Sequence, residues 1–109
     1  MSNEEYQKFW FDIIQIVDTY RSNTNLSLVE RDFDSPIADA FYAGTVEYLK
    51  NESNQKPPKW VFKDKYYLKS PWFANNFKNL ELKVLIMIET PVEFKTRNIF
   101  LGENTFSRC

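Results

Sequence analysis

A run of five consecutive apolar residues at positions 84–88 (VLIMI) constrains the fold more than any other feature of this chain. Such a run is stable in water only when other segments cover it, because the burial of apolar surface drives folding. We therefore expect the segment 80–101 to lie at the centre of the fold, with the rest of the chain packed around it.

This run can form either a helix or a strand. Apolar residues alternate as in a strand at Leu80, Leu82, Val84, Ile86 and Ile88. Leu85 and Met87 break the alternation, because they are also apolar and would fall on the opposite face. The two glycines of the chain leave few tight hairpins that could supply partner strands. We predict a buried helix over residues 80–88, and an α+β fold with 80–88 as a strand is the alternative.

Three pairs of a hydroxyl residue and a proline predict the starts of further helices, because they suit the N-cap and the first helical position. The pairs are Ser35-Pro36, Ser70-Pro71 and Thr90-Pro91. They predict helices over residues 36–50, 71–77 and 91–97. Glu93 would complete a capping box with the hydroxyl of the third pair. Asn98 or Gly102 is expected to take the left-handed conformation after the last helix.

The segment 3–21 is predicted to form an amphipathic helix. Its apolar residues recur at spacings of three and four: Tyr6, Phe9, Trp10, Ile13, Ile16, Val17 and Tyr20. Phe11 and Ile14 lie outside this stripe, so a second apolar contact is expected, either within the bundle or with another chain. The polar segment 51–58 contains two prolines and is expected to link the two helical halves.

Together these patterns predict a mostly α-helical fold, a compact bundle of about four to five helices. The 109 residues suffice for one core and are expected to form a single domain, residues 1–109. Three Trp, six Tyr and ten Phe predict a core rich in aromatic rings, with some rings left for a partner.

The residue inventory argues against an enzyme. The chain contains no histidine, which is the usual general base and the commonest metal ligand. The acidic residues Glu30, Asp32, Asp34 and Asp39 could in principle hold a divalent cation, but they lack the spacing of a calcium loop. We interpret them as charges that favour the start of the helix at residue 36. No catalytic, cofactor-binding or metal-binding residue is therefore predicted.

The single cysteine, Cys109, cannot form an internal disulfide, and no apolar stretch is long enough for a membrane span. The acidic first residues also lack the basic region of a signal peptide. A soluble, cytoplasmic protein that does not enter a membrane is expected. The abundance of Asn, Lys, Phe and Tyr is typical of AT-rich bacterial and phage genomes.

Charge is distributed unevenly along the chain. Residues 1–55 carry ten acidic and four basic side chains, whereas residues 56–109 carry five acidic and ten basic ones. Either the two halves attract each other, within the fold or between copies, or the basic half faces an anionic partner. We favour the first interpretation, because no basic run is long enough to act as a tail.

The segment 59–69 (KWVFKDKYYLK) is the most promising candidate for a binding surface. Lysines that neutralise phosphates beside rings that stack on bases are typical of single-strand binding. The candidate surface for a partner or nucleic acid comprises Lys59, Trp60, Lys63, Lys65, Tyr66, Tyr67, Lys69 and Arg97. The leading hypothesis is a small non-enzymatic interaction or regulatory protein that binds a protein partner or itself. The alternative is a nucleic-acid-binding regulator that uses this segment.

Overall fold

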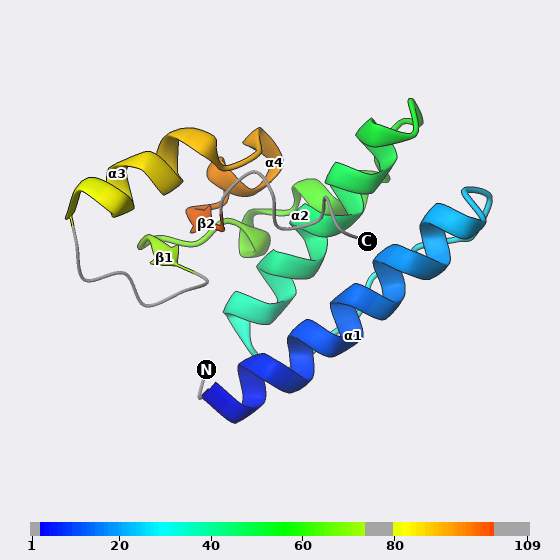
Figure 1. Cartoon of the computed structure of the whole chain (residues 1–109). Coiled ribbons are helices and arrows are strands. Elements are labelled where there is room, and N and C mark those ends of the chain that lie inside the picture. Colours follow the sequence, from blue (N-terminus) through cyan, green and yellow to red (C-terminus); the bar gives the residue numbers. More distant parts are fainter. Residues whose placement is uncertain (1–2, 74–79, 102–109) are drawn as a thin grey trace.

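The computed structural model describes residues 3–73 and 80–101 (Figure 1). Its longer elements are the helices α1 (Asn3–Ser22), α2 (Pro36–Glu52) and α3 (Leu80–Glu89). The short elements are the 3-10 turns η1 (Lys59–Phe62) and η2 (Asp64–Tyr66), the helix α4 (Val92–Lys95), and the strands β1 (Trp72–Phe73) and β2 (Ile99–Phe100). This mostly α-helical arrangement confirms the predicted fold class.

Helix α2 lies at the centre of the molecule. The expectation that the segment 80–101 would lie there is met only by its second half, where Phe94, Ile99 and Leu101 belong to the core. The middle of α2 is buried on every side, from Ala40 to Val46, and α1, η1, η2 and α4 all pack against it. The helix begins as predicted: Ser35 is the N-cap, and its Oγ accepts a hydrogen bond from the amide of Ala38 at 3.3 Å. A helix whose middle has no polar face must be covered on every side, and the short elements provide this cover together with α1.

Helix α1 runs alongside α2 and buries the predicted stripe, including Ile13, Val17 and Tyr20. A bidentate ion pair between Arg21 and Glu52, with both contacts at 2.9 Å, joins the C-terminal ends of the two helices. Phe11 lies outside the stripe and is 62% exposed. The predicted second contact of α1 therefore does not involve Phe11 within the described part of the chain.

Aromatic rings fill the space between the helices and confirm the predicted aromatic-rich core. Phe41 of α2 contacts four rings at centroid distances of 5.4 to 6.1 Å, which belong to Phe9, Trp10, Trp72 and Phe94. Three of these contacts are edge-to-face, the geometry that the quadrupoles of aromatic rings favour.

A helix over residues 71–77 was predicted after Ser70, but the described part of this segment forms a strand. Trp72 and Phe73 form the strand β1, which pairs in parallel with β2, and residues 74–77 lie outside the described residues. The amide of Trp72 donates to the carbonyl of Asn98 at 2.8 Å. Pairing with the segment after α4 thus prevails over the local helix-start signal.

Helix α3 confirms the predicted helical conformation of residues 80–88 and excludes the strand alternative. The prediction that this helix is buried was wrong over residues 84–88, the part whose side chains the structure describes. Val84, Leu85, Met87 and Ile88 are 47%, 48%, 38% and 67% exposed. The physical reason is that α2 and the rings around it already fill the core, so α3 lies at the side of the molecule away from α1 (Figure 1).

The end of α3 explains why Thr90 does not cap α4. The Thr90 hydroxyl donates to the carbonyl of Ile86 at 2.5 Å and accepts from the amide of Leu101 at 3.3 Å, so Pro91 takes the N-cap position. Helix α4 ends at Lys95, earlier than predicted. Asn98 has φ 63°, as predicted for a left-handed cap, and the chain then turns into the buried strand β2.

Candidate interaction surfaces

The structure divides the predicted candidate surface into exposed and buried residues. Lys59, Lys63, Lys65 and Lys69 are exposed, Trp60 and Tyr67 are half-buried, and Tyr66 and Arg97 are buried. Tyr66 and Arg97 are thus not part of the exposed surface, and binding of a partner or nucleic acid by the other residues stays a prediction. Residues 59–66 of this segment form the turns η1 and η2.

The rings of this segment anchor it to α2. Trp60 stacks on Tyr42 with a centroid distance of 5.8 Å and an interplanar angle of 20°, and it meets Tyr66 edge-on at 5.9 Å. Val61, between these rings, is fully buried. These rings are engaged in packing, which leaves little of them for stacking on bases. Phe62 differs, because its side chain is 49% exposed.

Arg97 is fully buried and connects several elements. Its Nη1 lies 2.5 Å from Glu47 Oε1 of α2 and donates to the carbonyl of Glu93 at 2.6 Å. Its Nη2 donates to the carbonyl of Val61 in η1 at 2.7 Å, and its guanidinium lies 4.8 Å from the ring centroid of Tyr67. No local pattern predicts this role, because a basic residue near a helix end is usually solvated.

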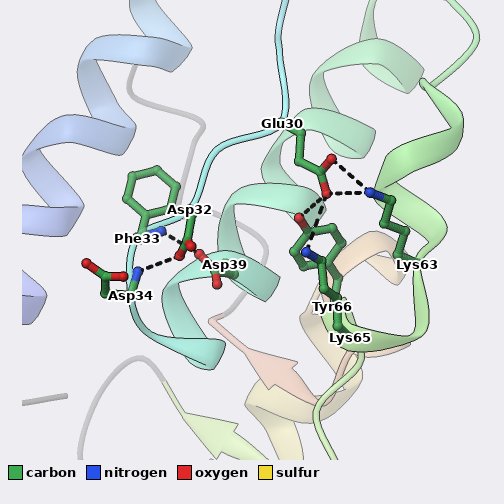
Figure 2. Close-up of polar contacts among 8 residues, drawn as sticks. All are labelled: Glu30, Asp32, Phe33, Asp34, Asp39, Lys63, Lys65 and Tyr66. Carbon is green, nitrogen blue, oxygen red and sulfur yellow. Dashed lines mark hydrogen bonds and ion pairs between the residues drawn. The ribbon is translucent and has the colours of Figure 1, made fainter.

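A second polar cluster joins the segment before α2 to η1 and η2 (Figure 2). Glu30 accepts hydrogen bonds from Lys63 Nζ at 2.9 and 3.0 Å and from the hydroxyl of Tyr66, and Lys65 Nζ lies 3.8 Å away. The hydrogen bond from Tyr66, followed by the one from Lys63, lowers the pKa of Glu30. Burial and the same hydrogen bond raise the pKa of the Tyr66 hydroxyl well above its ordinary value.

A polar pocket of about 300 Å³ lies beside this cluster, lined by Glu30, Arg31, Asp32, Asp39, Lys65 and Tyr66. Its aspartates already have hydrogen-bond donors. Asp32 Oδ1 accepts from the amide of Asp34 at 2.8 Å, and Asp39 Oδ1 accepts from the amide of Phe33 at 2.7 Å (Figure 2). Within residues 3–73 and 80–101, no group of three or more acidic, histidine or cysteine residues could hold a metal ion. We interpret the carboxylates of Asp32 and Asp39 as hydrogen-bond acceptors that hold the loop before α2 in its conformation.

The largest unexplained feature is apolar. Val84, Leu85, Met87 and Ile88 of α3, together with Val92 at the start of α4, form what we call the α3 surface, and each is 38–67% exposed. At about 100° per residue, the four residues of α3 cover an arc of roughly 160°. The exposed fractions of all five residues of the α3 surface correspond to roughly 400–500 Å², comparable to the largest apolar patch on an ordinary monomer.

The chain matches no protein-family model, and neither a characterised protein nor a solved structure shows significant similarity to it. None of the helices within the described residues is both long and apolar enough to cross a membrane. Any functional assignment therefore depends on the two surfaces described above, the exposed lysines of the segment 59–69 and the α3 surface.

Proposed function

We propose that this chain is a small non-enzymatic binding protein that docks on another protein surface through the α3 surface. The observation that carries the proposal is the exposure of four neighbouring apolar side chains on one helix, from Val84 to Ile88. A helix of this kind is ordinarily buried, and water is a poor environment for it. The proposal includes a bacterial or phage origin and action in the cytoplasm, where the lone Cys109 would remain reduced.

Covering the α3 surface contributes a large part of the free energy that binding needs. The five exposed fractions add up to roughly two and a half complete side chains, whose burial contributes about 4–8 kcal/mol. Association costs about 4–15 kcal/mol in lost translational and rotational freedom, so the partner must supply apolar surface of its own. A protein surface with a matching apolar face meets this requirement.

The nucleic-acid alternative has weaker support. The segment 59–69 has four exposed lysines, but two of them, Lys63 and Lys65, are paired with Glu30. The ring of Trp60 is packed on Tyr42. A titration with single-stranded DNA at two salt concentrations tests this alternative, because phosphate contacts weaken as salt rises. Binding at low salt that is lost in a Lys59→Gln, Lys69→Gln variant would favour it over the α3 surface.

The proposed function is tested by capture from cells that contain the chain. Tagged wild-type protein is compared with Ile88→Lys, which places a charge in the α3 surface, and with Phe11→Lys, a matched change at an equally exposed position on α1. We expect a protein held by the wild type and by Phe11→Lys and lost with Ile88→Lys. If all three variants capture the same proteins in equal amounts, the α3 surface is not the docking site and the proposal fails.

A further inference from the structure

We propose that the occupant of the α3 surface is a second copy of this chain, giving a two-fold symmetric dimer in which α3 packs against α3. This inference rests on the proposed function, since it names the partner of the same surface. Three observations support a second copy over an unrelated protein: the area of the surface, its lack of charge within the run 84–88, and its place at the side of the fold.

The area of the α3 surface matches the requirement of a dimer. Apolar atoms make up about 60% of a protein interface, so the 400–500 Å² of exposed apolar surface would form the apolar part of roughly 700–800 Å² on each chain. A standard stable interface buries about 800 Å² per partner. Two copies therefore cover each other's apolar residues with a polar rim of ordinary size, and no additional apolar surface is required.

The chemistry of the surface suits contact with itself. In a two-fold symmetric interface the same patch lies on both sides, so residues near the axis meet their own copies. A charged patch would bring like charges together, which costs energy. The run 84–88 contains no charged residue, whereas the segment 59–69 carries four exposed lysines. Among the exposed patches of the described residues, the α3 surface is thus the one best suited to meet a copy of itself.

The position of α3 permits the contact. The helix lies at the side of the molecule away from α1, so a second α3 can approach without displacing α2 (Figure 1). Val84, Met87 and Ile88 have the spacing i, i+3, i+4, which places them on one face and allows side chains of two helices to interdigitate. A symmetry axis perpendicular to α3 would bring the two helices together in antiparallel directions, an arrangement in which their dipoles attract.

Sedimentation equilibrium of the full chain tests this inference over about 1–500 µM, the range of a moderate dimer. We expect wild type and Phe11→Lys to approach twice the monomer mass of 13.1 kDa. Ile88→Lys should weaken the dimer at least tenfold. Circular dichroism checks that this variant stays folded, and Leu85→Lys serves as a second variant at another position of the α3 surface.

A second readout does not depend on any charge substitution. The chain has two methionines, Met1 and Met87, so the methyl signal of Met87 can be assigned with a Met87→Leu variant. We expect this signal to shift with protein concentration, in parallel with the mass, while the signal of Met1 stays constant. The inference is overturned by a wild type that remains monomeric throughout the range, or by a dimer that Ile88→Lys leaves unchanged.

The two failures can be told apart. A monomeric wild type whose capture of another protein is abolished by Ile88→Lys overturns the second copy as occupant and leaves the proposed docking function in place. A monomeric wild type whose captured proteins do not change with Ile88→Lys overturns both. A dimer that persists with Ile88→Lys and Leu85→Lys forms through another surface and overturns the second copy as occupant of the α3 surface, while the capture comparison alone decides on the docking function.

Discussion

Replacing Arg97 with alanine should destabilise the protein more than any substitution at an exposed position. Its guanidinium pairs with Glu47 at 2.5 Å and donates to the carbonyls of Glu93 and Val61. The alanine variant leaves these acceptors without their buried donor. The side chain of Glu47 is 17% exposed, so water only partly compensates for the lost ion pair.

The expected loss follows from the burial of the pair. Removing one partner of a buried ion pair costs about 3–5 kcal/mol, because the other charge remains without compensation. A domain of this length is stable by about 5–16 kcal/mol in total, so the loss is a large part of the whole. The cost reflects mainly the unpaired Glu47. A double variant, Arg97→Met with Glu47→Leu, should therefore recover most of the stability.

Urea unfolding followed by tryptophan fluorescence measures this effect. A loss of 3–5 kcal/mol should lower the midpoint for Arg97→Ala by at least about 1 M urea, with the slope of the transition unchanged. Arg97→Lys keeps the charge but lacks the fork that reaches two acceptors at once, so it should fall between wild type and alanine. A shift below about 0.3 M for Arg97→Ala would refute the view that this side chain joins α2, η1 and α4.

Two further predictions concern the loop before α2 and the contact between α2 and α4. The lowered pKa of Glu30 gives stability that is present above its ordinary value of 4.5 and is lost as the pH falls through its lower folded value. Wild type should therefore lose more stability than Glu30→Gln between about pH 5 and pH 3, as measured by urea midpoints, and parallel curves would contradict this. In Gly44→Ala the added Cβ would lie 3.0 Å from Cδ1 of Phe94. Overpacking costs about 1–3 kcal/mol, whereas alanine in place of glycine inside a helix gains about 0.5–1 kcal/mol, so we expect a net loss of about 1 kcal/mol and a melting temperature lower by roughly 4–8 °C. A raised melting temperature would show that the ring of Phe94 makes room at little cost.

The sequence was informative where a local signal acts alone. Ser35 and Pro36 predicted the start of α2 correctly, because a hydroxyl cap and a fixed φ act within one turn. The stripe of α1 was correct for a similar reason, since its spacing shows which face is apolar. Ser70-Pro71 failed, because the pairing of Trp72 with Ile99 depends on a strand far along the chain.

Composition did not predict which helix is buried in the core. The run 84–88 is more apolar than α2, whose middle contains Thr45 and Gly44, yet α2 occupies the core. The small residues of α2 explain this outcome, because they allow α4 to approach closely, with the ring of Phe94 against Gly44. Hydrophobicity sets how much an element gains by burial, whereas shape decides which element can be surrounded by the others.

Ion pairs between the acidic and the basic half of the chain affect which surface remains for a partner. Glu30 and Glu47 of the acidic half pair with Lys63, Lys65 and Arg97 of the basic half, so part of the attraction is satisfied inside one chain. Charges used in this way contribute less to steering a partner, since their fields largely cancel at a distance. The exposed apolar residues of α3 have no such compensation within the described part of the chain. Binding through the α3 surface should accordingly depend only weakly on salt, whereas binding through the exposed lysines of the segment 59–69 would weaken steeply as salt rises.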